Sequence, residues 1–283
     1  MSSPREKRNL ALLAGGVGLL LTWIAMPAQA GIIAYEPFAG TAEGELVGQV
    51  TGGTGLNGAW AGTTGVSTVA FDNAGLTYTD SNGGVLVQSG NSAGVSNHKI
   101  NLNDVQRNFT ATLPDSGTYY VSAVVRVSSV KYGNYFGVGL AGTGGAIVLG
   151  QQNNSWGIYS YDDNSGAVAG MSGNIGQMAF LVAKITKGST PGQSAVTLWV
   201  NPILGNEIAS GTGTTGTLTN NVAWTGISTP VWTGDASGGG NWLADVRVGT
   251  TFADVTPFAA IPEPASLALL GLGALAFLRR RRG

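Results

Sequence analysis

Residues 119–128 read Tyr-Tyr-Val-Ser-Ala-Val-Val-Arg-Val-Ser. In an extended strand, successive side chains point to opposite faces. The odd-numbered residues of Tyr119–Val127 therefore share one apolar face, and the even-numbered residues share the other. The second face is also apolar at its centre, at Val124. This pattern predicts a β-strand that is covered on both sides, as in a layered β protein.

Similar segments lie on both sides of this stretch. They are short, rich in β-branched and aromatic residues, and bounded by Gly, Asn, Ser and Thr. The further strand candidates are Val66–Phe71, Gly84–Gln88, Val105–Ala111, Tyr135–Leu140, Ala146–Gly150, Trp156–Ser160, Ala179–Thr186, Ala195–Val200 and Trp242–Val248. The Gly- and Thr-rich segment Gly211–Asn220 is expected to be a loop within the same domain.

The glycine content argues against helices. Glycine accounts for 46 of the 283 residues, and each glycine inside a helix costs ~1 kcal/mol relative to alanine. Ten or more short strands with turn residues between them are typical of a two-sheet β-sandwich. We therefore predict an all-β jelly-roll sandwich.

Composition excludes several classes of site and partner. The chain has no cysteine, so disulfides and thiolate metal sites are absent, and its single histidine, His98, lies in a polar segment typical of a loop. Between Gly31 and Ile261 there are seven basic and thirteen acidic residues, a net charge of −6. An acidic body binds the phosphate backbone poorly, so nucleic acid is not an expected partner.

The N-terminal residues 1–30 have the three parts of a secretory signal peptide. Arg5, Lys7 and Arg8 precede the apolar stretch Leu10–Ile24, and Ala28-Gln29-Ala30 follows as a small-residue cleavage box. We expect a signal helix that signal peptidase removes after Ala30, once the export machinery has engaged it. The alternative, an uncut membrane helix, is disfavoured by the short apolar stretch.

The C-terminal residues 257–283 combine three further elements. Pro262, Glu263 and Pro264 are followed by the uncharged segment Ala265–Leu278 and then by Arg279, Arg280, Arg281 and Arg282. As a helix, the apolar segment would be ~21 Å long, shorter than the ~30 Å hydrocarbon core. An arginine block beside an apolar run is typical of the cytoplasmic side of a membrane. A buried C-terminal helix is the alternative.

This arrangement resembles the PEP-CTERM sorting signal. The resemblance implies a C-terminal membrane helix that acts as a transient inner-membrane anchor. It also implies recognition and processing by an exosortase-type membrane enzyme. The protein would then pass to the cell surface or the extracellular matrix.

The body shows a second resemblance, to the laminin G-like, concanavalin A-like jelly roll. The segments that carry it are Tyr35–Phe38, Gly52–Trp60, Phe180–Ile185, Val196–Pro202 and Trp242–Val255. It implies one domain over residues 31–256 and a structural role for Trp199. It also implies that the last strand pairs with the N-terminal segment, which would place Val246 and Val248 beside that segment.

Catalytic carboxylates are poorly represented. Glycoside hydrolysis needs two carboxylates, ~5–5.5 Å apart in retaining enzymes, and the hydrolase branch of the resembled superfamily carries them as E-x-D-x-x-E. The nearest match is Glu43 with Glu45, but the Asp and the third acid are missing. We therefore predict that the protein is not an enzyme, with an atypical glycoside hydrolase as the alternative.

Sugar binding is the favoured function of the body. Trp156, Tyr159 and Tyr161 stand beside Asp162 and Asn164, which combines aromatic faces with polar edges; Tyr132, Asn134 and Tyr135 form a second such group. The alternative is that these aromatic rings pack in the sandwich. The sequence predicts an exported, non-enzymatic surface or matrix protein that associates with extracellular polysaccharide, or a purely structural matrix protein without a ligand.

No cofactor is expected, with calcium as the one possible exception. Asp162, Asp163 and Asn164 supply oxygen ligands, but Gly173 stands where an EF-hand loop requires glutamate. Asp72-Asn73 and Asp80-Ser81-Asn82 are weaker candidates. Each of these segments is more typical of a plain turn.

Overall fold

The computed structural model describes residues 31–39, 45–62, 69–72, 75–88, 90–95, 105–114, 116–127, 135–142, 145–152, 155–160, 166–172, 177–188, 194–218, 223–232 and 241–259. The predicted signal peptide, the sorting segment from Ala260 onward and His98 lie outside these residues.

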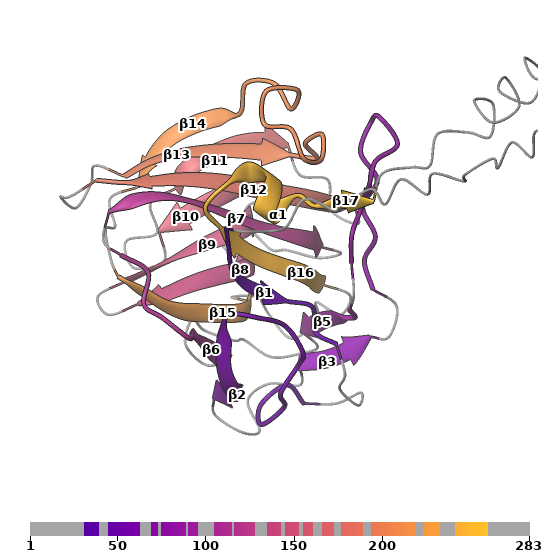
Figure 1. Ribbon diagram of the computed structural model, residues 1–283, viewed down its shortest axis with the longest axis vertical. Helices are drawn as coiled ribbons and strands as arrows, with labels where there is room; N and C mark the ends of the chain where they lie inside the picture. The colour runs from indigo at the N-terminus through magenta and orange to yellow at the C-terminus, as the bar shows by residue number, and fades with distance from the viewer. Residues whose placement is uncertain are drawn as a thin grey trace, which may run out of the picture.

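Two antiparallel sheets form the sandwich that the sequence predicts (Figure 1). The first sheet consists, in spatial order, of β14 (Thr214–Leu218), β13 (Ser194–Val200), β12 (Met178–Lys187), β7 (Gly117–Arg126), β16 (Asn241–Gly249), β5 (Ser92–Val95) and β3 (Val69–Asp72), with β1 (Ile32–Glu36) also paired to β16. The second sheet consists of β11 (Gly166–Ser172), β10 (Ser155–Ser160), β9 (Gly145–Gln152), β8 (Tyr135–Gly142), β15 (Trp224–Trp232), β6 (Val105–Phe109) and β2 (Leu56–Gly62). The prediction of an all-β jelly-roll sandwich is confirmed.

The central strand β7 has the two covered faces that its sequence indicates. Tyr119, Val121 and Val125 point into the main core between the sheets. On the other face, Tyr120 and Val124 belong to a second, smaller core. The outer face of the first sheet is therefore also covered around β7.

Three short segments build this second core. They are the stretch from Leu76 to β4 (Val85–Leu86), the loop after β13 that contains Leu204, and the single-turn helix α1 (Phe252–Val255). The strand β17 (Phe258–Ala259) follows α1 and pairs with β4. Of the described residues, none belongs to a helix with the length and apolarity needed to span a bilayer.

The last long strand closes the sandwich against the first. In the β1–β16 pair, Ala34 lies opposite Val248 and Glu36 opposite Val246, as the jelly-roll resemblance implies. Trp199 is also structural, because its ring is buried and its Nε1 donates a hydrogen bond to the Gly211 carbonyl at 3.0 Å.

The segment Gly211–Asn220 corrects one expectation. Instead of lying wholly in a loop, its residues Thr214–Leu218 form the edge strand β14 and pair with β13. Leu218 is fully buried in the main core. Hydrogen bonding to β13 and the burial of Leu218 therefore stabilise a strand here, although glycine has a low strand propensity.

Candidate functional site

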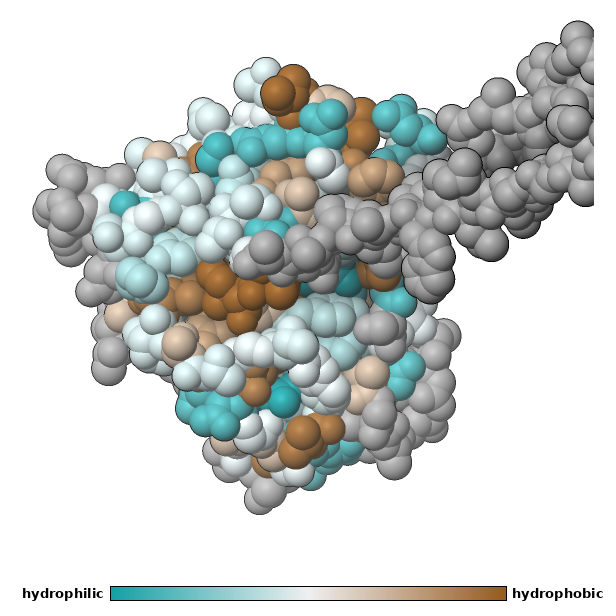
Figure 2. All heavy atoms as spheres, viewed as in Figure 1, coloured by the Kyte–Doolittle hydropathy of each residue, from teal (hydrophilic) through white to brown (hydrophobic). Residues whose placement is uncertain are grey.

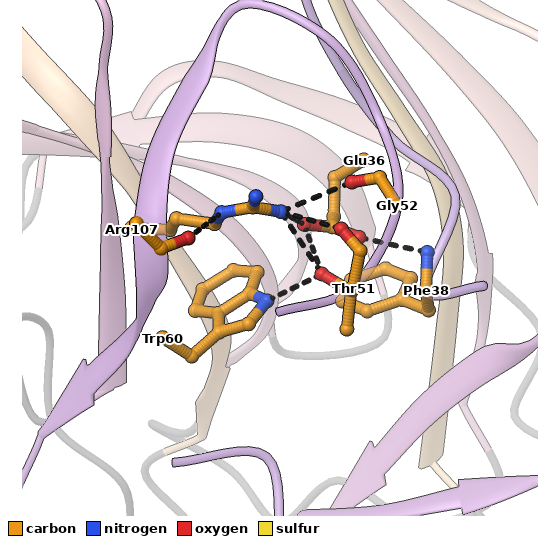
Figure 3. Close-up of polar contacts among 7 residues, drawn as sticks. Glu36, Phe38, Thr51, Gly52, Trp60 and Arg107 are labelled. Carbon is orange, nitrogen blue, oxygen red and sulfur yellow. Dashed lines mark hydrogen bonds and ion pairs between the residues drawn. The ribbon is translucent and has the colours of Figure 1, made fainter. Parts of the chain in front are cut away.

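A buried polar network connects the N-terminal segment to the second sheet (Figure 3). At its centre, Arg107 Nη1 lies 2.7 Å from Glu36 Oε2. The Thr51 hydroxyl donates a hydrogen bond to the same carboxylate oxygen at 2.6 Å and accepts one from Trp60 Nε1 at 2.9 Å. We call Glu36, Thr51, Trp60 and Arg107 the Glu36 network.

Backbone groups complete the network. The Phe38 amide donates to Glu36 Oε1 at 2.8 Å. Arg107 donates to the carbonyl oxygens of Thr51, Gly52 and Gly58 at 2.7, 3.2 and 3.0 Å. The guanidinium therefore joins β6 to the chain that enters and leaves the Thr51 turn.

The electrostatics of this network suit a structural role. Burial raises the pKa of the Glu36 carboxyl above its ordinary value, and hydrogen bonds from Thr51, Phe38 and Arg107 oppose that rise. Glu36 has no exposed surface and Arg107 is 4% exposed, so a substrate cannot reach either group. The pair closes the sandwich and does not offer a catalytic carboxylate.

The sequence carries a signal for this network in β6 and β1. Val105 and Phe109 point into the main core, and Arg107 shares their face of β6 by strand alternation. A lone arginine on a core-facing strand position requires a buried partner. Glu36, at the end of the otherwise uncharged strand β1, is that partner.

The predicted glycan platform is corrected for two of its residues. Trp156 and Tyr159 are both only 3% exposed, and Trp156 packs in the main core. The Tyr159 hydroxyl is hydrogen-bonded to the Ser155 carbonyl at 2.9 Å. Because a buried ring cannot stack on a sugar, neither residue offers a platform; core packing holds for Trp156, while Tyr159 is buried on the opposite face of β10. Tyr161, Asp162, Asp163 and Asn164 lie outside the described residues.

The carboxylates weighed for catalysis and calcium are likewise placed only in part. Glu45 is exposed beside a turn, while Glu43, Tyr132 and Asn134 lie outside the described residues. Asp80 Oδ1 accepts hydrogen bonds from the Asn82 and Gly84 amides, each at 2.8 Å, and Oδ2 accepts one from the Leu204 amide at 2.9 Å. In the described part of the chain, no group of three or more His, Cys, Asp or Glu side chains could hold a metal ion.

A hollow of about 530 Å³ lies where Asp80 joins the two loops. Its lining comes from Asp80, Asn82 and Gly84 before β4, from residues 203–206 and Ala209 after β13, and from Phe258 in β17. Figure 2 shows hydrophobic residues projecting at the top of the molecule, over the loop that follows β13. Phe258, which lines this hollow, precedes the last described residue, Ala259, after which the sorting segment follows.

Comparison with known protein families matches residues 260–282 to the PEP-CTERM protein-sorting motif. The chain carries a PEP-CTERM sorting motif. This confirms the resemblance that Pro262–Pro264, the apolar segment and the arginine block indicate. The PEP-CTERM motif implies a protein that is exported, recognised by an exosortase and transiently anchored in the membrane through its C-terminal segment.

The body has weaker likenesses. No curated protein matches the sequence. Among solved structures, the cellulose-induced protein Cip1 is 16% identical, with 65% of this chain and 86% of that chain covered and a TM-score of 0.40. A protein of unknown function from Shewanella oneidensis MR-1 is 11% identical, with 81% and 89% covered and a TM-score of 0.41. The alginate lyase Aly36B is 13% identical, with 77% and 96% covered and a TM-score of 0.38. At these values the likeness says nothing about activity in the PEP-CTERM protein.

Proposed function

We propose that the protein is a non-enzymatic component of the cell surface or extracellular matrix, delivered there by exosortase-dependent sorting. The observation that carries this proposal is the position of the PEP-CTERM motif. It begins at residue 260, directly after β17 ends at Ala259. The β-sandwich is thus the cargo, and the motif can be processed without disturbing either core.

Replacing Pro262, Glu263 and Pro264 with alanine tests the sorting step. In cells that contain the exosortase, we expect the variant to stay membrane-bound while the wild-type protein reaches the surface or medium. A matched control carries Thr215→Ala and Thr217→Ala in the exposed edge strand β14 and should be sorted normally. Release of the motif variant with unchanged mass and yield would contradict the proposal.

We further propose that the delivered sandwich associates with extracellular polysaccharide. Its destination supports this, because polysaccharide is a main component of such matrices. The remaining candidates for contact are Tyr161, Asp162 and Asn164, which follow β10 directly. Calcium binding at Asp162–Asn164 stays a prediction.

A glycan array with the exported protein tests this association. We expect binding to at least one acidic or neutral polysaccharide, and we expect Tyr161→Ala to weaken it without changing the unfolding temperature. Tyr159→Ala is the control, since the buried ring should affect stability and not the glycan contact itself. Absence of binding to every glycan would favour a purely structural matrix protein.

The proposal of no enzymatic activity has its own test. The exported protein is incubated with the same polysaccharides, and soluble products are measured by mass spectrometry. We expect no cleavage. Cleavage that is lost in Glu43→Gln or Glu45→Gln would establish the glycoside hydrolase alternative.

A further inference from the structure

Exposed apolar side chains concentrate at one end of the molecule. Among the described residues, four large hydrophobic side chains are exposed, and two of them belong to the segments that form the hollow near β17: Phe258, at 46%, lines it, and Ile208, at 93%, is next to Ala209, which also lines it. The other two are Val50, in the turn segment before β2, and Val85 in β4, which pairs with Ala259 and faces away from Phe258. Scattered exposed hydrophobics are ordinary, but a group of them at one place marks an interaction surface.

The segments that carry these two side chains are tied to each other and to the chain before β4. The Leu204 amide donates to Asp80, the Gly205 amide donates to Thr256 Oγ1 at 3.0 Å, and the Tyr78 hydroxyl donates to the Pro202 carbonyl at 2.8 Å. Phe258 packs so closely on Gly205 that a Cβ there would lie 2.4 Å from its ring. The surface is therefore a fixed part of the fold.

The tip of the loop presents Ile208 to solvent. The Ala209 amide donates to Asn206 Oδ1 at 2.9 Å, and the Ser210 hydroxyl donates to the Asn206 carbonyl at 2.8 Å, which closes the turn around Ile208. The neighbouring carboxylate of Glu207 is paired with Lys184 at 2.9 Å and accepts a hydrogen bond from Tyr120. The charges nearest to Ile208 are thus already neutralised.

The position of this end relative to the membrane follows from chain length. Ala265, where the apolar segment begins, lies six residues after Ala259. Fully extended, six residues span at most ~22 Å. A membrane-inserted apolar segment would therefore hold this end of the sandwich beside the bilayer, whose interfacial layer is itself ~5–8 Å deep.

We propose that Ile208 and Phe258 form a membrane-contact surface. They lie in the lipid interface of the outer leaflet for as long as the C-terminal segment remains inserted. This inference rests on the membrane anchoring that the PEP-CTERM motif implies. Its consequence is a fixed orientation of the sandwich, with β17 toward the membrane and the Pro262–Pro264 motif held at a constant height for the exosortase.

Single cysteines carrying an environment-sensitive NBD label test this surface, because the chain has no cysteine of its own. The full chain is reconstituted into phosphatidylethanolamine–phosphatidylglycerol vesicles with a label at Ile208→Cys. The matched control is Ala61→Cys, an exposed position on β2 at the far end of the molecule from β17 (Figure 1). A third label, at Leu270→Cys, reports whether the apolar segment is inserted.

We expect a blue shift of the emission at residue 208, with quenching by doxyl-labelled lipid, and neither effect at residue 61. An aqueous signal at residue 208 with a lipid signal at residue 270 would overturn the inference and leave the anchoring intact. A blue shift at residue 208 without lipid quenching would show burial against protein and would also overturn it. An aqueous signal at residue 270 would instead contradict the anchoring on which the inference rests.

Discussion

Replacing Arg107 with methionine is expected to destabilise the sandwich severely. The substitution keeps the length and apolar stem of the side chain and removes the charge beside Glu36 Oε2, 2.7 Å away. It also removes the donor to the carbonyls of Thr51, Gly52 and Gly58. Because Glu36 is fully buried, its carboxylate would then be left in the core without a countercharge.

The size of the effect follows from the burial of both partners. Removing one partner of a buried ion pair costs about 3–5 kcal/mol, since an uncompensated charge remains. The cost should grow between pH 4 and pH 7, because burial raises the pKa of Glu36 and the loss of Arg107 would raise it further. Protonation of the carboxyl at low pH relieves the penalty.

A double-mutant cycle separates the ion pair from the rest of the network. Urea denaturation of the exported protein, followed by circular dichroism, gives the free energy of unfolding for Arg107→Met, Glu36→Gln and the double variant. We expect the double variant to be more stable than the sum of the single effects by about 1–3 kcal/mol. Arg126→Met, at a partly exposed position on β7, is the control and should cost much less. A cost below about 1 kcal/mol for Arg107→Met, or additive single effects, would refute the reasoning.

Three further predictions concern other parts of the fold. Burial raises the pKa of Asp245 to about 6, so the wild-type protein loses stability as the pH rises from about 4 to about 6. Relative to wild type, Asp245→Asn should therefore gain roughly 3 kcal/mol over that interval in urea denaturation, whereas a pH-independent difference would contradict this. Gly55 has a φ of +70° and a Cβ there would lie 1.7 Å from the Ile33 carbonyl oxygen, while Gly58, with a φ of +65°, faces open space. In thermal unfolding, Gly58→Ala should cost about 1–2 kcal/mol, and Gly55→Ala should cost much more. Equal losses of stability in the two variants would be inconsistent with the close approach at Gly55. Trp156→Ala removes a buried ring and should cost about 3–5 kcal/mol of unfolding free energy, with glycan binding reduced no more than the folded fraction.

Ten of the seventeen described strands could be predicted because they depend on local patterns, whereas β1, β2, β5, β11, β14, β15 and β17 are not among the predicted candidates. The pairing of β1 with β16 was implied by the jelly-roll resemblance and not by a local pattern. The alternation of Tyr119–Val127 is enough to specify a strand with two covered faces, and both cores are present where it requires them. The edge strand β14 was missed because Thr214–Leu218 has few apolar residues and is stabilised by its pairing with β13.

The internal site was harder to predict, because it depends on contacts between distant segments. Glu36 and Arg107 are 71 residues apart, and only the register of two sheets brings them together. Aromatic residues near polar ones suggested a sugar site at Trp156 and Tyr159, yet β10 is buried on both faces, so both side chains are covered although they point to opposite faces. Sequence proximity alone could not distinguish a platform from a core.

The mass of the mature C-terminus tests the central claim most directly. The protein is recovered from the surface or medium of cells with an active exosortase, and its C-terminal peptide is identified by mass spectrometry. We predict a C-terminus at or close to Pro262–Pro264, downstream of an intact sandwich, with the apolar segment and Arg279–Arg282 removed. Recovery of surface-located protein that retains every residue through Gly283 would contradict the account.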